Sequence, residues 1–580
     1  MRPRQSEASF QNFFRARRYA LAAMKITRTT RPIGSRTLGA LVLAGLCSAP
    51  ALASAALLPA ASVPHAAGLT DLGRAPAGMP IQLAFTLPYQ HQAELDVLLA
   101  DFGNPASPLF GARLTPAQFR SYFAPASADQ ERTIAVLRAA GFTVVRTYSN
   151  RSVIDAVAPS HAVERFFGTD IHRVAQAHEG VRYANATVAS LPTALSGLIS
   201  GVTGLNNLQL MHFHYAFGQR RALAPDGTIG KPLRGPDGGY GPLAFANGYN
   251  LPVQHGFDGT GHTAGIVIGG NPSDSDLAGY LSAFGVTRTG TTTRVPIDGG
   301  PGSDSGDEIE ATLDYETIAS LAPGADIVIY EPDEIPFAQI IDSYNRAVSD
   351  ALVETLDSSF GICETAEPAF AKQTEHIAKQ AAAIGIVFHA STGDAGSQGD
   401  DCSGNSGVDT PASSPSFVAV GGTTLSVAKS GDYFSETAWP EAGGGVSTMF
   451  ARPAYQKGVP NVISSGRNLP DLSFDADPST GESFFFDGEF EGPIGGTSLS
   501  APIFGAMVVE LDQMHGAPFT GGFNPPAYAA FLANGYGKGK TAFWHDIVFG
   551  SNGAFSAKKG YDQATGIGSP DADNLSALLP

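Results

Sequence analysis

The segment 495–502, which reads Gly-Gly-Thr-Ser-Leu-Ser-Ala-Pro, contains a serine that is placed for nucleophilic chemistry. Ser498 follows two small residues at what reads as a loop-to-helix junction, so we expect it to be exposed. The N-terminal end of a helix carries positive charge, which would stabilise an oxyanion formed beside Ser498. A bare serine hydroxyl is a poor nucleophile and needs a neighbouring base. The identity of that base therefore decides the class of chemistry.

A histidine base of the subtilisin type finds little support in the sequence. Such enzymes need a His-Gly-Thr-His-type segment and an aspartate that closes an early apolar strand. The apolar strand expected at 265–268 runs into Gly269-Gly270-Asn271, without an aspartate. The chain has 13 histidines, and none lies in a His-Gly-x-His string. A carboxylate base is the remaining choice.

Glu310 and Asp314 supply a pair of carboxylates at helical spacing. The stretch 308–325 has the apolar periodicity of a helix, and residues four apart lie on one face, one turn apart. Two like charges that are close and partly desolvated raise the pKa of at least one of them. Such a pair would take a proton from Ser498 in mildly acidic water. The alternative is the ordinary solvated acidic face of a surface helix.

A third acid, Asp394, lies in a Gly-rich loop after the apolar run 384–387. That run is expected to be a strand, and sites of α/β proteins usually lie where strands end. A protonated Asp394 would donate a hydrogen bond to the oxyanion of an acyl-transfer reaction. The alternative is an ordinary aspartate in a turn.

Taken together, these residues resemble the sedolisin family, the serine-carboxyl peptidases. The resemblance covers nearly the whole chain through an ordered set of segments, which are 310–314, 321–325, 357–361, 391–396, 411–415, 420–424, 443–447, 453–456, 470–473 and 496–498. It implies a subtilisin-like α/β catalytic domain, with a parallel sheet flanked by helices, after an α+β, ferredoxin-like activation prodomain. It also implies insensitivity to pepstatin and, in particular, similarity to the secreted bacterial members.

The resemblance implies a role for each of the four residues. Ser498 would be the nucleophile and Glu310 the general base and acid. Asp314 would orient Glu310, and Asp394 would be the acid of the oxyanion hole. The segment 357–361 would form an extended wall that pairs with the substrate backbone.

The resemblance also implies one calcium ion near the C-terminus. Its ligands would be the side chains of Asp546 and Asp562 and the backbone oxygens of Ile547, Lys558 and Gly560. Carboxylates and free carbonyls in a glycine-bearing loop suit this hard cation. The chain departs from the family pattern at Lys558, where glycine is usual, and the charge of the two neighbouring lysines disfavours a cation.

The chain is long enough for more than one domain, because it has 580 residues. Four parts are expected, namely a signal peptide at 1–55, an activation prodomain at 56–207, a linker at 208–240 and a peptidase domain at 241–580. In the prodomain, the patterns predict strands at 81–85 and 142–145 and helices at 90–99 and 128–140. The Gly- and Pro-rich stretch 219–241 is expected to be exposed and to contain the processing region.

An export signal is expected at the N-terminus, where Arg36 precedes the apolar run 38–46 and small residues follow. The basic stretch before it is long, so Met24 is an alternative start. The exported protein would then keep two cysteines, Cys363 and Cys402. In an oxidising compartment we expect them to form a disulfide, and the alternative is two buried thiols.

Charge is divided unevenly along the chain. Residues 241–580 hold 13 Lys+Arg against 41 Asp+Glu, whereas the chain as a whole holds 36 against 54. An acidic peptidase domain gains little positive self-repulsion in acid, and it is not expected to bind nucleic acid. The excess of basic residues before 241 suggests that the prodomain docks on the peptidase domain and loosens as pH falls. No later segment is apolar and long enough for a membrane span.

The sequence therefore predicts a secreted, monomeric, acid-active endopeptidase that is made as a proenzyme and inhibited by its own prodomain. Three alternatives stay open at this point. The first is a tripeptidyl-peptidase of the same family, the second is a histidine-based protease in which His389 or His262 acts, and the third is a non-catalytic, calcium-stabilised binding module.

Overall fold

The computed structural model describes residues 69–176, 180–208, 211–220, 233–302, 305–333, 335–400, 402, 407–519 and 521–579. The predicted signal peptide, its alternative start at Met24 and residues 221–232 of the predicted processing region lie outside the described residues. Among the described residues, no helix is long and apolar enough to cross a membrane.

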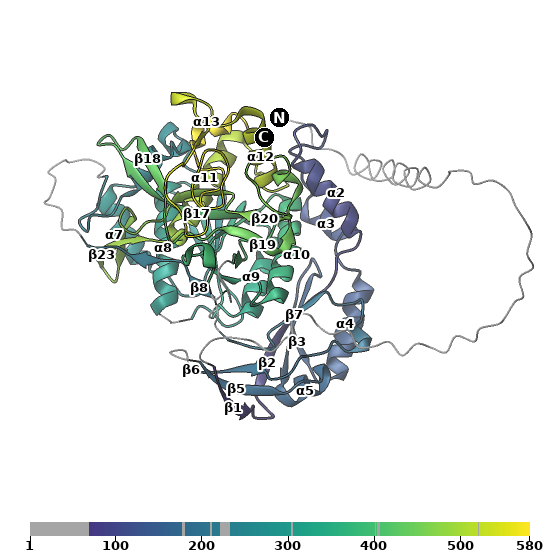
Figure 1. Cartoon of the computed structure of the whole chain (residues 1–580). Coiled ribbons are helices and arrows are strands. Elements are labelled where there is room, and N and C mark those ends of the chain that lie inside the picture. Colours follow the sequence, from purple (N-terminus) through teal and green to yellow (C-terminus); the bar gives the residue numbers. More distant parts are fainter. Residues whose placement is uncertain are drawn as a thin grey trace, which may run out of the picture. The chain divides into compact units, whose positions relative to one another are not determined.

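The N-terminal domain is an α+β unit with an antiparallel sheet in the order β3-β4-β2-β7 (Figure 1). A second sheet has the order β1-β5-β6. The predicted strands and helices correspond to β2, β3, α2 and α4. The elements are β1 (Thr70–Arg74), β2 (Pro80–Thr86), α2 (Gln92–Phe102), α3 (Pro116–Tyr122), α4 (Ser127–Ala139), β3 (Thr143–Thr147), β4 (Val153–Pro159), α5 (Ser160–Phe167), β5 (Ile171–Gln176), β6 (Gly180–Asn185) and β7 (Gly201–Thr203).

The catalytic domain is built on an eight-stranded sheet in the order β11-β12-β10-β13-β15-β17-β18, with β21 beside β17. All its pairings are parallel except that of β17 with β18. The predicted parallel sheet is therefore confirmed. Its strands are β10 (Thr263–Val267), β11 (Thr292–Pro296), β12 (Asp326–Glu331), β13 (Thr355–Asp357), β15 (Val387–Ser391), β17 (Phe417–Val427), β18 (Tyr433–Ala438) and β21 (Leu472–Asp475).

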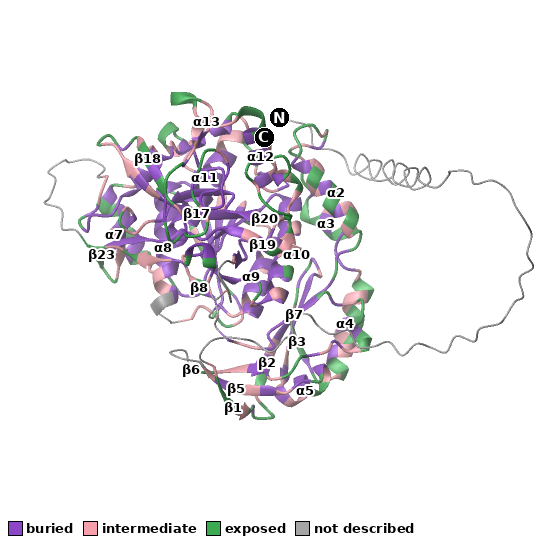
Figure 2. Ribbon diagram, viewed as in Figure 1, coloured by how far each residue is buried: buried purple, intermediate pink, exposed green. Residues whose placement is uncertain are grey.

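Helices cover this sheet, as predicted. α11 packs on β13, β15 and β17, and α8 lies along α11. Residues 497–512 of α11 are all buried (Figure 2). Residues 497–509 are apolar or small on every side, and the two acids that follow, Glu510 and Asp512, are buried with them. The helices are α6 (Pro242–Gly248), α7 (Asp274–Phe284), α8 (Ser305–Leu321), α9 (Phe337–Asp350), α10 (Pro368–Ile384), α11 (Thr497–His515), α12 (Asn524–Asn534) and α13 (Ala572–Ser576). The run 384–387 was expected to be one strand, but Ile384 ends α10 and the strand begins at Val387.

Smaller sheets surround the sheet edge where β13 and β15 end. One has the order β16-β14-β8 and another β22-β23-β9, while β19 pairs with β20 and β24 with β25. Each of the two three-stranded sheets includes a strand from the predicted linker. Their strands are β8 (His212–Phe213), β9 (Ala216–Phe217), β14 (Phe360–Cys363), β16 (Asp409–Thr410), β19 (Gly445–Ala451), β20 (Gly466–Leu469), β22 (Glu482–Phe486), β23 (Glu489–Gly495), β24 (Trp544–His545) and β25 (Ser569–Pro570).

The N-terminal domain contacts the catalytic domain through helices α9 and α10, against which β2, β4 and β7 pack. Buried polar groups pair across this interface. Tyr148 Oη donates to Asp342 Oδ1 at 2.8 Å, and Asn150 Nδ2 donates to Asn345 Oδ1 at 2.8 Å. Because these buried groups satisfy one another, separating the domains would leave them to be satisfied by water.

Three aspartates from both domains meet in this interface. Oxygens of Asp155, Asp298 and Asp342 lie within 4.8 Å of one another, and Arg146 Nη2 lies 3.3 Å from Asp298 Oδ1. Burial, with the charge of Asp298, raises the pKa of Asp155 to about 7. Burial also raises the pKa of Asp342 well above its ordinary value. The cluster therefore binds protons when the domains are docked, and it opposes the expected loosening of the prodomain in acid.

Replacing Asp155 should change how stability depends on pH. A carboxyl whose pKa is raised in the folded state contributes stability that is complete below its ordinary pKa of 3.8 and is lost as pH rises to about 7. That loss is about 1.4 kcal/mol for each pH unit. In an inactive Ser498→Ala background, Asp155→Asn should match the parent's melting temperature near pH 3.5 and exceed it at pH 8.

Thermal unfolding across this pH range measures the effect. The control is Asp432→Asn, which removes an exposed carboxylate and should leave the pH profile unchanged. A gap between Asp155→Asn and its parent that stays constant with pH would contradict the assignment.

Candidate active site

Gly496 holds Ser498 at the start of α11 in a backbone conformation that side chains rarely adopt. Its φ is 103°. A Cβ at Gly496 would lie 2.0 Å from the carbonyl oxygen of His214 and 2.5 Å from Asp394 Oδ2. Glycine therefore lets a carbonyl group and an acid approach the nucleophile together.

Helix α8 brings two carboxyl groups beside Ser498, because α8 packs along α11. Glu310 and Asp314 are both fully buried, so the alternative that they belong to the solvated face of a surface helix is wrong. Ser359 Oγ donates to Asp314 Oδ1 at 2.7 Å, and Ser498 Oγ donates to the carbonyl oxygen of Ser359 at 3.2 Å. Among the described residues, neither Glu310 oxygen has a hydrogen-bond partner. The structure thus gathers a serine and two carboxyl groups in one buried space.

A third buried acid, Asp357, belongs to this group and was missed as an acid by the sequence analysis. It ends β13, and its Oδ1 accepts a hydrogen bond from Ser358 N at 2.8 Å. From the sequence, Asp357 is expected only as part of the wall 357–361. The signal that was available is its position at the end of an apolar strand, the same signal that identified Asp394.

Burial raises the pKa of all three carboxyls well above their ordinary values. For Glu310, the Ser498 hydroxyl lowers the pKa, and the charges of Asp357 and Asp394 raise it further. For Asp314, burial is the largest cause of the raised pKa, and the charges of Asp357 and Glu310 raise it further. The group therefore holds protons at pH values where an exposed carboxyl has lost them.

Asp394 lies on the other side of Gly496 and contacts the start of α11. Its Oδ1 accepts hydrogen bonds from Thr497 N at 2.9 Å and from Thr497 Oγ1 at 2.8 Å. Among the described residues, its buried Oδ2 has no partner. Burial raises the pKa of Asp394 well above its usual value, against the two bonds from Thr497. Oδ2 and the His214 carbonyl oxygen both approach Gly496, so the acid faces the position of an oxyanion.

Residues 212–217 of the predicted linker lie over Ser498, between β14 and β23. β8 pairs antiparallel with the predicted wall at β14, and β9 pairs antiparallel with β23. Between these strands, Ser498 N donates to the carbonyl oxygen of His214 at 2.9 Å. The expectation that Ser498 is exposed is wrong for the precursor, because this segment covers it. The described end of the linker is packed too, since Ser483 Oγ donates to the buried Asp237 at 2.6 Å.

The two histidines considered as bases lie elsewhere. His389 is fully buried, with Nδ1 3.2 Å from Asp357 Oδ1, and burial lowers its pKa to about 3. His262 lies beside Glu354, with Nδ1 3.9 Å from Oε1. Among the described residues, no histidine side chain forms a hydrogen bond with the Ser498 hydroxyl. The geometry gives a histidine base no support.

The C-terminal loop brings together the two carboxylates of the expected calcium site. Gly560 N donates to Asp546 Oδ1 at 3.0 Å, and Lys558 N donates to Asp562 Oδ2 at 2.8 Å. Burial and the charges of these two acids raise the pKa of Tyr536. Within the described part of the chain, neither acid forms an ion pair with a basic side chain. Both acids accept hydrogen bonds from backbone N–H groups, and carboxylate oxygens are the kind of ligand that suits a hard cation.

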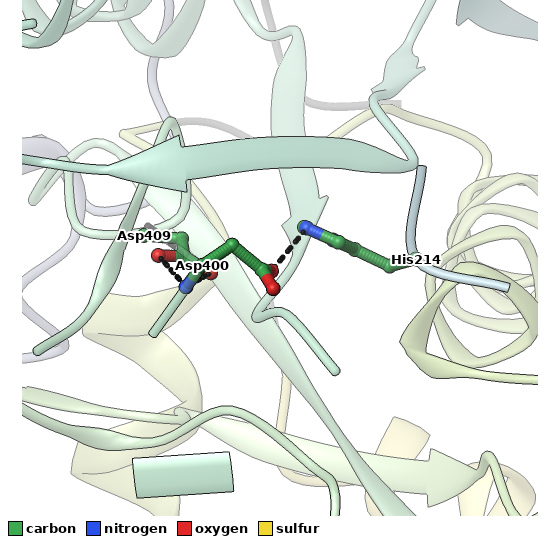
Figure 3. A group of neighbouring side chains, drawn as sticks. All are labelled: His214, Asp400 and Asp409. Carbon is green, nitrogen blue, oxygen red and sulfur yellow. Dashed lines mark hydrogen bonds and ion pairs between the residues drawn. The ribbon is translucent and has the colours of Figure 1, made fainter. Parts of the chain in front are cut away.

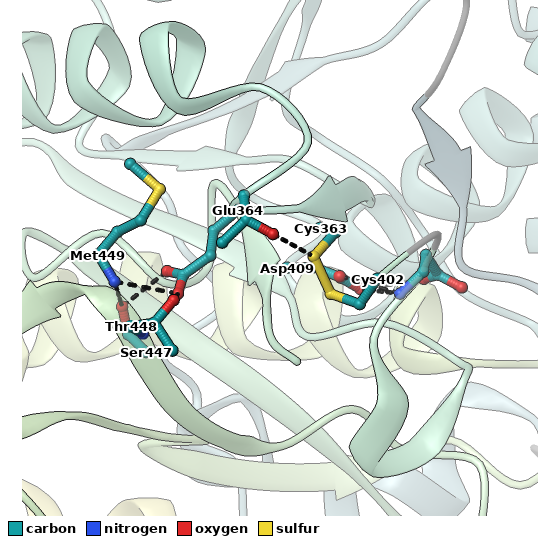
Figure 4. The surroundings of a disulfide bond; sticks show 9 residues. Cys363, Glu364, Cys402, Asp409, Ser447, Thr448 and Met449 are labelled. Atoms are coloured by element: carbon teal, nitrogen blue, oxygen red, sulfur yellow. Dashed lines mark hydrogen bonds between the residues drawn. A yellow bond between two sulfur atoms is a disulfide. The ribbon is translucent and has the colours of Figure 1, made fainter. Parts of the chain in front are cut away.

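A disulfide joins Cys363 to Cys402, with a Cα–Cα distance of 5.0 Å, so the expected pairing is confirmed (Figure 4). Cys363 ends β14, and its N donates to the carbonyl oxygen of Asp400 at 2.9 Å. Next to it, Glu364 accepts hydrogen bonds from Ser447 and Thr448. The bridge thus ties the wall of the cleft to the loop that follows Asp394.

A parallel sheet with a serine at a helix start, buried acids around that serine and a separate N-terminal domain together define a serine-type peptidase with an activation domain. Residues 67–208 match the pro-kumamolisin activation domain, and residues 254–536 match the subtilase family. Sedolisin from Pseudomonas sp. (strain 101) is 31% identical over 543 residues, which cover 89% of this chain and 89% of that protein.

Other relatives agree. Kumamolisin from Bacillus sp. (strain MN-32) is 32% identical, over 73% of this chain and 85% of that protein. The solved structure of Pseudomonas sedolisin, a serine-carboxyl proteinase complexed with two molecules of pseudo-iodotyrostatin, matches with a TM-score of 0.52 at 29% identity. That match covers 58% of this chain and 97% of that structure. The chain belongs to the sedolisin family of serine-carboxyl peptidases and is made as a proenzyme with an activation domain.

Proposed function

We propose that this protein is a secreted, acid-active endopeptidase in which Ser498 is the nucleophile and Glu310 is its general base. The observation that carries the proposal is the burial of Glu310 and Asp314 beside Ser498, with Asp394 facing the oxyanion position from the other side of Gly496. Contact with Ser498 supports Glu310 as the base, because the Ser498 hydroxyl lowers the pKa of Glu310 against the effect of burial. Polypeptides are the proposed substrates, and the prodomain is the intramolecular inhibitor of a monomeric precursor.

In the proposed mechanism, Ser498 Oγ attacks the scissile carbonyl carbon while its proton passes to Glu310. Asp314, held by Ser359, keeps the Glu310 carboxyl in place. Ser498 N and the protonated Asp394 donate hydrogen bonds to the oxyanion, which lowers the barrier because they are already oriented. Glu310 then protonates the leaving amine, and water hydrolyses the acyl-enzyme with Glu310 again taking and returning the proton.

Activity in acid follows from the state of these groups. Asp394 donates a hydrogen bond only while it is protonated, and its raised pKa extends that state above the range of an ordinary carboxyl. The coupled acids beside Ser498 need at least one ionised member to accept a proton. The enzyme should therefore work between the loss of the last proton acceptor at low pH and the loss of the Asp394 proton at higher pH.

Export to an oxidising compartment is supported by the Cys363–Cys402 disulfide, since such bonds persist mainly outside the cytosol. Endopeptidase action is supported by the cleft. The chain continues beyond β8 on one side of Ser498 and beyond β9 on the other, with backbone pairing on both sides. A tripeptidyl-peptidase would need the cleft to be closed beyond the third residue on the acyl side, and Met211 continues the chain past that point.

One calcium ion is proposed in the C-terminal loop. Asp546 and Asp562 would supply carboxylates, and Ile547, Lys558 and Gly560 would supply backbone oxygens. The bound ion would neutralise the two acids and fasten the loop, so its contribution is to stability. The charge of Lys558 does not enter the donor set, because the proposed ligand there is a carbonyl oxygen.

The first test is hydrolysis of a denatured protein by the acidified precursor from pH 3 to pH 8. The natural chain should be active below about pH 5, which matches the need for protonated carboxyls. Ser498→Ala and Glu310→Gln should be inactive. Activity near neutrality that survives Glu310→Gln would overturn the carboxylate mechanism in favour of a histidine base, and inactivity at every pH would favour the binding module.

Asp394→Asn tests the oxyanion acid separately. The amide of asparagine donates a hydrogen bond at every pH, although it is a weaker donor than a carboxylic acid. We expect kcat at pH 4 to fall about 10²- to 10³-fold, the usual loss for an oxyanion donor. The residual activity should persist to higher pH than that of the natural enzyme. A pH–kcat profile whose upper limb does not move would contradict this role.

Calcium should stabilise the inactive Ser498→Ala precursor. At a hundredfold excess over Kd, the free energy of unfolding should rise by about 2.7 kcal/mol, and a chelator should reverse this. Asp562→Asn should abolish the response, whereas magnesium should not replace calcium because it requires a smaller octahedral site. A melting temperature that is unaffected by both calcium and chelator would contradict the proposed site.

A further inference from the structure

One peptide bond of the chain itself occupies the position of a substrate. The His214 carbonyl oxygen accepts a hydrogen bond from Ser498 N, so the bond between His214 and Tyr215 lies at the nucleophile. On the acyl side, Phe213 pairs with Phe360 and His212 with Gly361. On the amine side, β9 pairs with β23. An extended strand held on both sides of the nucleophile is the productive arrangement for hydrolysis.

The side chain of His214 points toward Asp400, with Asp409 next to it, beside this bond (Figure 3). Its exposed fraction is 1%. His214 Nδ1 lies 2.7 Å from Ser391 Oγ, and Nε2 lies 3.1 Å from Asp400 Oδ2. Behind Asp400, Asp409 accepts hydrogen bonds from Asp400 N at 3.0 Å and 3.2 Å. The imidazole therefore meets a hydroxyl on one side and a carboxylate on the other.

Glycines give this pocket its shape. A Cβ at Gly361 would lie 2.8 Å from His214 Cε1, so the ring lies directly against the backbone of the wall. A Cβ at Gly393 would lie 2.3 Å from Asp409 Oδ2. A side chain at position 361 would displace the His214 ring, and one at position 393 would displace Asp409. Glycine at both positions avoids these clashes.

The charge of the pocket favours a cation. Among the described residues, the ion-pair partner of Asp400 is His214, and Asp409 has no ion pair with a basic side chain. Burial alone would raise the pKa of Asp400, yet the His214 imidazole holds it below its ordinary value. Asp400 is half-buried, and an uncharged occupant in place of the imidazole would leave its charge without this partner.

We propose that Asp400, with Asp409 and Ser391, selects histidine or another cationic side chain on the acyl side of the scissile bond, and that His214–Tyr215 is the first bond the precursor cuts. This inference rests on the proposed function of Ser498 and Glu310. Ser498 Oγ bonds to the His214 carbonyl carbon, the carbon–nitrogen bond to Tyr215 breaks, and the serine proton leaves with the Tyr215 amine through Glu310. Water then releases His214 as a carboxylic acid and restores Ser498.

The position of this bond differs from the processing region expected from the sequence. The stretch 219–241 was chosen for its glycines, prolines and basic residues, whereas the bond at Ser498 lies before it. A first cut at 214–215 gives a peptidase chain that begins at Tyr215. Later trimming within 219–241 would be a separate event.

The order of cuts tests the maturation bond. The purified precursor is acidified, and products are identified over time by intact mass and N-terminal sequencing. We expect the first new N-terminus at Tyr215. His214→Leu should slow this first cut at least tenfold, and His214→Lys should retain it. A first cut elsewhere, or a rate that is unchanged in His214→Leu, would overturn the proposal.

The mature enzyme tests the pocket. In matched quenched peptides that differ only at the acyl-side residue, kcat/KM for histidine, lysine and arginine should exceed that for leucine at least tenfold. Asp400→Asn should reduce kcat/KM for the cationic peptides at least tenfold relative to that for the leucine peptide. Asp432→Asn, a surface control, should change neither. An apolar preference, or a selectivity ratio that is the same in Asp400→Asn, would overturn the assignment.

Two readouts keep this inference distinct from the proposed function. In one outcome, hydrolysis of denatured protein depends on Ser498 and Glu310 but shows no preference for cationic side chains. That result would contradict the proposed specificity pocket and would still support the proposed mechanism. If Asp400→Asn does not fold, the His214 series in the natural pocket still decides, because those substitutions change only the substrate segment. Absence of all hydrolysis would defeat both proposals.

Discussion

The burial of several carboxyl groups without a matching cation is the constraint on which the site depends. Glu310, Asp314 and Asp357 are each 0% exposed, and no ion pair with Lys or Arg reaches them among the described residues. An ionised carboxylate in such a place costs several kcal/mol, whereas the protonated acid does not. The packing of α8 along α11 therefore favours the protonated state of these acids.

The same solution recurs across the catalytic domain, where acids outnumber bases. Glu482 is fully buried, and burial raises its pKa to about 7. It accepts hydrogen bonds from the hydroxyls of Tyr280 and Thr317. Hydroxyl donors satisfy a carboxyl without adding charge, so they replace the salt bridges that a neutral-pH enzyme would use. Stability that depends on such groups is lost as pH rises, which couples the working range of the site to that of the fold.

Much of this arrangement could be predicted from local sequence. The spacing of Glu310 and Asp314 placed them on one helix face, and the strand-end position of Asp394 placed it near the same sheet edge. The involvement of Ser359 and Asp357 could not be predicted, because it depends on how β13 and β14 lie against α8. The position of His214 depends on strand register across more than 140 residues, which local patterns do not encode. Burial of Ser498 follows from that same long-range pairing.

The segment 212–217 inhibits the site by occupying it as a substrate would, so it must also be able to leave that site. The charges of the site explain how it can do so. While the bond at His214 is intact, its carbonyl is neutral and accepts the hydrogen bond from Ser498 N. Hydrolysis converts that carbonyl into a carboxylic acid, with an ordinary pKa of about 3.5, beside Asp394 and the acids around Glu310. A new carboxylate there is repelled by every neighbour that is ionised and costs desolvation where neighbours are neutral. The proposed cut would therefore turn an interaction that holds the segment into one that expels it.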